Sequence, residues 1–153
     1  MREKITTSGQ PSAAQLTALK AADVTTIINL APHDHPRSLK DEAAICAGLG
    51  LNYIHIPVAF DTPRQSDYDR FRRAMDSHAH DHVHVHCIVN ARVSAFFYRY
   101  DQETGLLSEA DARTRMQAIW NPGGVWAEFI GDMTRTGEDH LYAGRDYPRF
   151  GDE

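Results

Sequence analysis

The sequence predicts an α/β fold, a three-layer sandwich in which helices flank a central, mostly parallel sheet of four to five strands. Short β-rich runs alternate along the chain with segments of helix-forming composition, and this alternation is typical of parallel sheets with right-handed crossovers. Helix starts are marked by Ser-x-x-Gln and Ser-x-x-Asp motifs, in which the serine oxygen can accept a hydrogen bond from a free helical amide. These motifs begin at Ser12, Ser38, Ser66 and Ser108.

Four runs have the composition of strands. Residues 24–30 are β-branched and mostly apolar, as expected for a strand that is buried on both faces. Residues 53–58 form a second strand, and residues 82–87, which alternate with period two, form a third. Residues 5–7 are predicted to add a strand at an edge of the sheet.

The second half of the chain is mainly helical in pattern. Helices are predicted over residues 91–103, 108–120 and 125–133, because apolar residues recur there at helical spacing between Gly-rich breaks. We therefore predict a single domain over residues 1–133. Residues 134–153 are dominated by Gly, Asp, Arg and Pro and are predicted to form a loosely held tail.

Composition and charge exclude several classes of function. The net charge of −5 argues against a protein that grips nucleic acid by bulk electrostatics, although a local pocket can still attract a small anion. No stretch approaches the roughly 18 apolar residues of a membrane span, and residues 1–6 lack the apolar core of a signal peptide. We expect a cytoplasmic protein without a membrane partner; the sequence leaves the oligomeric state open.

Residues 86–92, His-Cys-Ile-Val-Asn-Ala-Arg, are predicted to carry the chemistry. Cys87 ends a predicted strand directly before a helix, and ligands of open parallel sheets bind at this edge. The backbone N–H groups of residues 88–92 are expected to converge there, with the positive end of the helix dipole behind them. Such a nest binds a tetrahedral anion and favours the thiolate form of a cysteine.

Side chains of this segment support an anion site. Arg92 offers a planar set of donors suited to two oxygens of a phosphate. Asn90 tolerates left-handed backbone angles, so the loop can turn there without glycine. Ser94 is a further candidate that could hydrogen-bond the thiolate or the leaving group. The plainer hypothesis is that Cys87 is a small buried apolar residue. The predicted anion-binding residues of this segment are Ile88, Val89, Asn90, Ala91, Arg92 and Ser94.

The pattern His86-Cys87-x-x-Asn90-x-Arg92 resembles the signature loop of cysteine-dependent protein phosphatases, in the compact dual-specificity-like branch. Residues 7–11 (TSGQP), the run IINL and the strand YIHIPV are similar to bacterial proteins related to the beta-lactamase-hydrolase-like phosphatase domain. The similarity covers roughly residues 5 to 131. One feature departs from the usual loop: four residues, not five, separate the cysteine from the arginine, a length shared with many rhodanese-like sulfurtransferases.

The resemblance implies hydrolysis of a phosphorylated protein or small molecule through a phosphocysteine, without a metal or other cofactor. Cys87 would be the nucleophile, Arg92 would hold the phosphate, and His86 would fix the loop by hydrogen-bonding its backbone. The implied general acid is an upstream aspartate, either Asp61 or Asp34, since each follows the carboxyl end of a predicted strand.

The same resemblance implies a role for Gln10, which would line the pocket or orient the hydrolytic water. Cys46 is predicted to lie in the core, with a disulfide to an oxidised Cys87 as the alternative. The histidines at even positions 82–86 would share one face of a strand, but a buried strand leaves little room for a metal, so no metal site is predicted.

Two further hypotheses for the function stay open. One is a rhodanese-like sulfurtransferase that carries a persulfide on Cys87. The other is a catalytically inactive phosphatase fold that binds a phosphate or a phosphoprotein, because apolar Ile88 and Val89 lie at the expected pocket and the general acid is not fixed.

Overall fold

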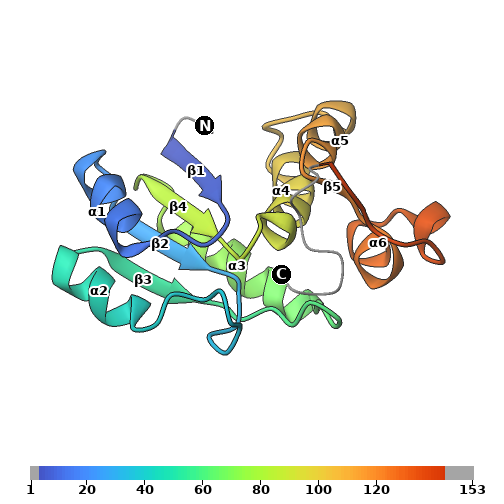
Figure 1. The fold of residues 1–153 in the computed structure, drawn as a ribbon. Helices are drawn as coiled ribbons and strands as arrows, with labels where there is room; N and C mark the ends of the chain where they lie inside the picture. The colour runs from blue at the N-terminus through green and yellow to red at the C-terminus, as the bar shows by residue number, and fades with distance from the viewer. Residues whose placement is uncertain (1–3, 144–153) are drawn as a thin grey trace.

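The computed structural model describes residues 4–143 and has a central sheet of four parallel strands, which confirms the predicted fold class. The strand order is β1-β4-β2-β3, so β4 is an interior strand and β1 lies at an edge, as predicted (Figure 1). Ser8 and Asn29 both pair with His86, and Asn29 pairs with His55, so the carboxyl ends of all four strands lie level. The strands are β1 (Ile5–Ser8), β2 (Thr26–Asn29), β3 (Asn52–His55) and β4 (Val83–His86).

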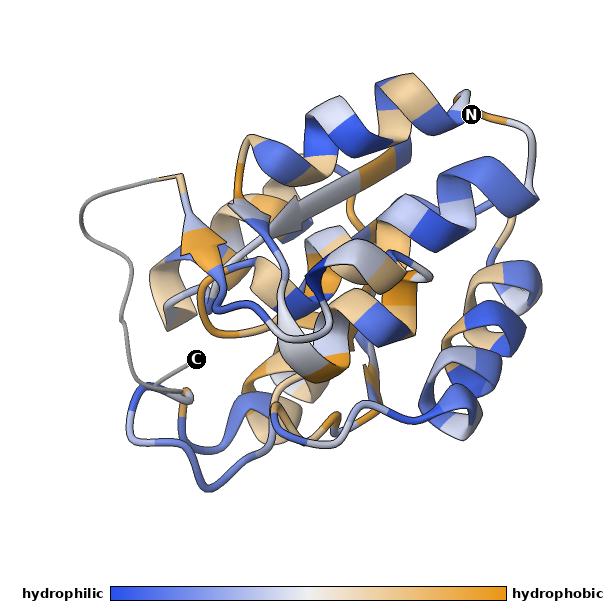
Figure 2. Ribbon diagram, turned by 90° about the vertical axis from the view of Figure 1, so that its right-hand side faces the viewer, coloured by the Kyte–Doolittle hydropathy of each residue, from blue (hydrophilic) through white to orange (hydrophobic). Residues whose placement is uncertain are grey.

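Helices cover both faces of this sheet. On one face, Leu16 and Cys46 pack against Ile27; on the other, Phe71 and Phe96 belong to the cluster around Ile28. The side chains of neighbouring residues in β2 therefore point to opposite faces of the sheet, as expected for a strand buried on both sides. Apolar residues concentrate on the strands and inner helix faces (Figure 2). The helices are α1 (Ala13–Ala21) and α2 (Glu42–Leu49) on the first face, α3 (Gln65–Ser77) and α4 (Ala91–Glu103) on the second, and α5 (Glu109–Gln117) and α6 (Gly124–Ile130), which pack on α4.

Two of the four predicted helix starts are confirmed. At the start of α1, the Ser12 hydroxyl accepts a hydrogen bond from the Gln15 amide at 3.1 Å, and the Gln15 side chain accepts one from the Ser12 amide at 2.8 Å. At the start of α5, the Ser108 hydroxyl accepts from the Asp111 amide at 3.2 Å.

The other two starts are wrong. Helix α2 begins only at Glu42, after Asp41 in a left-handed conformation, and the Ser38 hydroxyl donates to a loop carbonyl instead. Helix α3 begins at Gln65, one residue before the predicted serine, and the carboxylate of Asp67 accepts from the amide that precedes the helix. A short motif such as Ser-x-x-Asp also occurs by chance in a sequence. At α2 and α3, contacts with the rest of the fold therefore decide where the helix begins.

A second, two-stranded sheet lies beyond α5. The predicted helix over 108–120 ends at Gln117, and β5 (Trp120–Asn121) pairs antiparallel with β6 (Leu141–Tyr142). The Trp120 ring stacks on the Tyr142 ring at 5.6 Å, which explains why a residue predicted as helical lies in a strand. Within the predicted tail, residues 134–143 thus include an ordered strand; the domain boundary stays a prediction, and residues 144–153 lie outside the described part.

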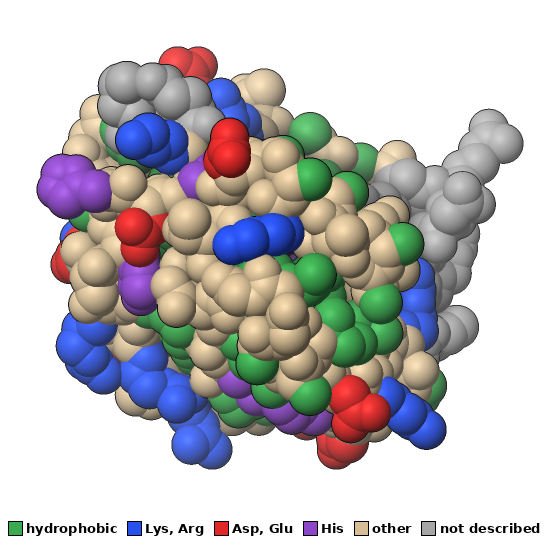
Figure 3. All heavy atoms as spheres, turned by 90° about the vertical axis from the view of Figure 1, so that its left-hand side faces the viewer, with side chains coloured by type: hydrophobic (Ala, Val, Ile, Leu, Met, Phe, Trp, Pro, Cys, Tyr) green, Lys and Arg blue, Asp and Glu red, His purple; other side chains and the backbone are tan. Residues whose placement is uncertain are grey.

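Figure 3 looks onto the end of the sheet at which the strands begin. Acidic, basic and histidine side chains all appear on this face, and several Lys and Arg side chains gather at its lower left. Within residues 4–143, no helix combines the length and the apolar character needed to cross a membrane.

Candidate active site at the carboxyl end of β4

The segment between β4 and α4 forms a tight loop that begins at Cys87. Asn90 takes φ +69°, the left-handed conformation that the sequence predicted for it, and α4 begins at Ala91. Cys87 therefore lies at the carboxyl end of an interior strand, just before the positive end of a 13-residue helix. Its side chain is fully buried.

Two carbonyl groups of this loop, those of Cys87 and Ile88, are held by hydrogen bonds from neighbouring residues. The Cys87 carbonyl lies 3.0 Å from His86 Nδ1, and the Ile88 carbonyl accepts from the Gln10 amide at 3.0 Å. In a trans peptide the next N–H points opposite to the carbonyl, so the amides of Ile88 and Val89 point away from these partners. The amides of residues 88–90 have no acceptor within residues 4–143. They are donors available to an anion, and their role in binding one stays a prediction.

Glycine at position 9 makes this arrangement possible. A Cβ added to Gly9 would lie 3.2 Å from the carbonyl carbon of Ile88 and 3.3 Å from Cα of Val89, and closer still to the Ile88 oxygen. Because all three neighbours are backbone atoms, no side-chain rotation relieves the contact. The β1–α1 connection can approach the loop only without a side chain here.

Arg92 is buried against the connection between β3 and α3. Its Nε donates to the Val58 carbonyl at 2.8 Å, and its guanidinium carbon lies 5.2 Å from the centre of the Phe60 ring. The Phe60 carbonyl in turn accepts from the indole of Trp126 at 2.6 Å. The fold thus fixes the guanidinium at one end while the side chain is only 1% exposed.

Glu42 is a site residue that the sequence did not reveal. Its carboxylate lies 2.6 Å from His86 Nε2 and accepts from Gln10 Nε2 at 3.0 Å, so it joins three separate segments behind the loop. Glu42 and His86 have side chains that are 2% and 0% exposed. An acidic residue opening a helix is common for reasons of the helix dipole alone. No sequence signal therefore distinguishes this one, 44 positions from its partner.

The two candidate acids are placed differently. Asp61 is exposed, accepts from the Thr62 hydroxyl at 3.1 Å, and follows directly after Phe60, which packs on Arg92. Asp34 is also exposed, in the connection after β2. Of the two, the structure ties the segment of Asp61 to the loop arginine.

Ser94 is not brought to the thiol by a described contact. Its hydroxyl donates to the Ala91 carbonyl at 2.9 Å, and it lines a depression together with Asn90, Tyr98 and Arg115. A contact of Ser94 with the thiolate or leaving group stays a prediction.

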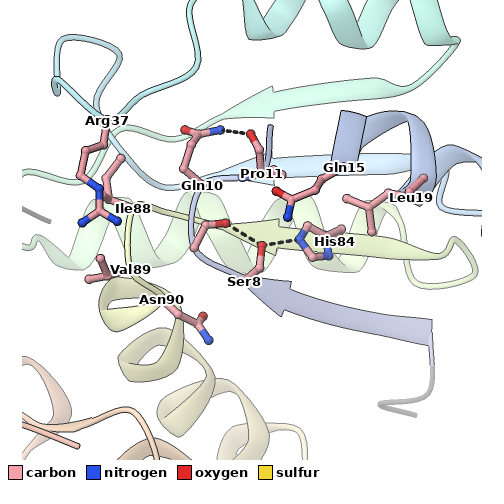
Figure 4. A pocket seen from close by; sticks show the side chains of 12 residues that line it. Ser8, Gln10, Pro11, Gln15, Leu19, Arg37, His84, Ile88, Val89 and Asn90 are labelled. Carbon is pink, nitrogen blue, oxygen red and sulfur yellow. Dashed lines mark hydrogen bonds between the residues drawn. The ribbon is translucent and has the colours of Figure 1, made fainter. Parts of the chain in front are cut away.

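A groove of about 780 Å³ runs beside the loop, and Gln10 lines it; the role of Gln10 in the pocket of Cys87 stays a prediction. Figure 4 shows Arg37 beside Ile88, with its guanidinium directed toward Val89. Among the described residues that line the groove, Arg37 is the one Lys, Arg, Asp or Glu. The lining residues are Ser8, Gly9, Gln10, Pro11, Gln15, Ala18, Leu19, Arg37, His84, Ile88, Val89 and Asn90.

The histidines of β4 are held by hydrogen bonds. His84 Nδ1 and Nε2 lie 2.7 Å and 2.8 Å from the hydroxyls of Thr6 and Ser8. Burial, with the nearby His86 and His82, lowers the pKa of His84 to about 4, so it is neutral near pH 7. Within the described range 4–143, no group of three or more His, Cys, Asp or Glu is placed to hold a metal ion.

Comparisons with solved structures find clear relatives. A candidate phosphatase of the DUF442 family from Shewanella putrefaciens is 33% identical, with 83% of each chain covered and a TM-score of 0.74. TpbA from P. aeruginosa, solved in complex with pTyr, is 17% identical over 86% of this chain and 76% of that chain, with a TM-score of 0.59. The core catalytic domain of the PP-IP phosphatase SIW14 from S. cerevisiae is 10% identical over 88% and 77%, with a TM-score of 0.64. A scan against protein-family models and a search of curated proteins gave no match.

The fold and the loop together define a member of the cysteine-dependent phosphatase superfamily, which confirms the resemblance noted in the sequence. At 17% and 10% identity, TpbA and SIW14 show the shared fold alone. Within the superfamily the chain belongs to the DUF442 family, because its 33% identity to the Shewanella putrefaciens protein extends over 83% of both chains.

Proposed function

We propose that the chain is a phosphomonoester hydrolase that works through a phosphocysteine at Cys87. The observation that carries the proposal is the orientation of the loop: the carbonyls of Cys87 and Ile88 are bound by His86 and Gln10, and the amides of residues 88–90 have no acceptor among the described residues. Three backbone donors without acceptors, at a helix start and next to a thiol, suit a phosphoryl group.

In the first step, the Cys87 thiolate attacks phosphorus, an S–P bond forms and the bond from phosphorus to the leaving oxygen breaks. The leaving oxygen takes a proton from a carboxylic acid. In the second step, water attacks phosphorus, the S–P bond breaks, and the carboxylate receives the proton from water. Inorganic phosphate leaves and the thiolate is restored. The amides of residues 88–92 and the Arg92 guanidinium hold the phosphoryl oxygens throughout.

Asp61 is the proposed acid. It follows Phe60 in a turn in which the Thr62 amide donates to the Ala59 carbonyl at 3.2 Å. That turn packs on Arg92 through Phe60 and is anchored by Trp126, so the segment of Asp61 is held beside the loop arginine, which favours Asp61 as the acid. Asp34 is the alternative acid, and a comparison of Asp61→Asn with Asp34→Asn distinguishes the two.

The substrate is proposed to be a phosphorylated protein or small molecule, in a cytoplasmic setting. Both cysteines are free thiols in the structure, which is compatible with a reducing compartment. The 33% identical relative from Shewanella putrefaciens is described as a candidate phosphatase, which favours phosphate transfer to water over a sulfurtransferase reaction at the same cysteine.

Hydrolysis of p-nitrophenyl phosphate tests the proposal. We expect turnover that vanadate inhibits, that Cys87→Ser abolishes, and that Cys46→Ala retains. Cys46 is the matched control because it is a second buried thiol, packed in the other hydrophobic cluster. Sulfur transfer from thiosulfate to cyanide that exceeds phosphate turnover would favour the sulfurtransferase, and phosphate binding without turnover would favour a binding module.

A further inference from the structure

The buried pair of Glu42 and His86 reveals its proton content through its hydrogen bonds. His86 Nδ1 lies 3.0 Å from the Cys87 carbonyl, and a carbonyl only accepts, so Nδ1 carries a proton. His86 Nε2 lies 2.6 Å from Glu42 Oε2. One more proton must lie between these two atoms, since without it two lone pairs would face each other at that distance. The pair therefore holds two protons and has no net charge.

The position of the second proton is set by Gln10. Its Nε2 donates to the other carboxyl oxygen of Glu42 at 3.0 Å, and such a bond favours the carboxylate. Burial also favours a neutral pair over a lone charge, because an unpaired carboxylate at 2% exposure would be costly. The arrangement with a carboxylate on Glu42 and a doubly protonated ring on His86 satisfies every bond.

Apart from Cys87 of the loop itself, four titratable groups near the pair remain neutral near pH 7. His84 on β4 and His55 on β3 both have lowered pKa values, for which burial is the largest cause and His86 a contributor. Burial, with Glu42 as a contributor, raises the pKa of Cys46 on α2 to about 11, and it also raises the pKa of Tyr53 on β3. None of these four groups supplies a charge that would compensate a bare Glu42.

We infer that Glu42 keeps His86 in the imidazolium form and is thereby a positioning residue for the Cys87 loop. A charged donor binds the Cys87 carbonyl more strongly than a neutral one. The pair also directs its positive end toward the loop that is proposed to bind the anion. The effect on turnover rests on the proposed function; the charge state of the pair does not.

Nitrogen NMR on histidine-labelled wild-type protein tests the charge state. Near pH 7 we expect both ring nitrogens of His86 to be protonated, with the signals assigned by their loss in His86→Asn. A bare Nε2, which would place the second proton on Glu42, or a bare Nδ1 would overturn the inference without any need for a variant that folds.

Glu42→Gln is the matched variant for the positioning role. Its amide can donate to Nε2 of a neutral His86 and its oxygen can accept from Gln10, so all bonds of the network are kept while the charges are removed. We expect unchanged melting behaviour, a bare Nε2 on His86, and a loss of about tenfold in both inorganic phosphate affinity and kcat/KM. Glu42→Ala, which also deletes the bonds, should lower the melting temperature as well.

Two outcomes are decisive for the role. Phosphate affinity and turnover that match wild type in a folded Glu42→Gln protein would overturn it. If instead wild type hydrolyses no aryl phosphate while the NMR and phosphate-binding results are as expected, the proposed function fails and this inference stands.

Discussion

Replacing Gly9 by alanine should damage the loop from a position that touches no substrate. The new methyl group would lie under 3.0 Å from the Ile88 oxygen and 3.3 Å from Cα of Val89, so backbone must move. Overpacking of this kind costs about 1–3 kcal/mol of stability. Because the displaced atoms carry the amides next to Cys87, a shift of about 1 Å is expected to lower turnover about 10²-fold.

Thermal unfolding and p-nitrophenyl phosphate hydrolysis measure the two effects of Gly9→Ala. We expect a melting temperature lower by roughly 2–12 °C. Gly48→Ala is the control, since its Cβ meets nothing within 4 Å and the residue lies inside α2. That variant should be more stable by about 0.5–1 kcal/mol at unchanged activity. Full activity and stability in Gly9→Ala would refute the close contact between the two loops.

Three further predictions address single side chains. Arg92→Lys loses the bond to the Val58 carbonyl and the planar donor set, so kcat/KM for aryl phosphates should fall about 10²–10³-fold; a loss under twofold would contradict its role. Asp61→Asn should slow phenyl phosphate about 10²-fold, and p-nitrophenyl phosphate less, while Asp34→Asn leaves both rates intact; the reverse order would assign the acid to Asp34. The pKa of His84, lowered to about 4, means that the unfolded chain binds the proton more readily, so the free energy of unfolding should decrease by up to about 3 kcal/mol as pH falls from about 6.5 to 4. Denaturant unfolding at several pH values should show a smaller decrease in His84→Gln, and an equal decrease would contradict the assignment.

Local patterns were sufficient to predict the sheet and the helix after the loop. The run around Ile27 and Ile28 has to be buried on both faces, and the structure places these residues in two different hydrophobic clusters. Asn90 could be predicted because few residue types accept a positive φ. By contrast, Trp120 adopts strand geometry through ring contacts with Phe60 and Tyr142, and no local pattern contains those partners.

The residues that hold the loop in place from other segments were less predictable than the loop itself. Glu42 acts through a partner 44 positions away, and Gly9 matters because of a backbone contact with Ile88. Both facts depend on how β1, α2 and β4 are brought together. The loop residues themselves are contiguous, so their chemistry and spacing could be interpreted from the sequence alone.

Covalent labelling of Cys87 tests the central claim most directly. Wild-type protein and Asp61→Asn would be mixed with p-nitrophenyl phosphate, quenched in acid within the first turnover, and digested for mass spectrometry. The account predicts a phosphoryl group on the peptide that contains Cys87, absent in Cys87→Ser and more abundant in Asp61→Asn. Turnover that proceeds with no phosphate on Cys87, or with the phosphate on another residue, would contradict it.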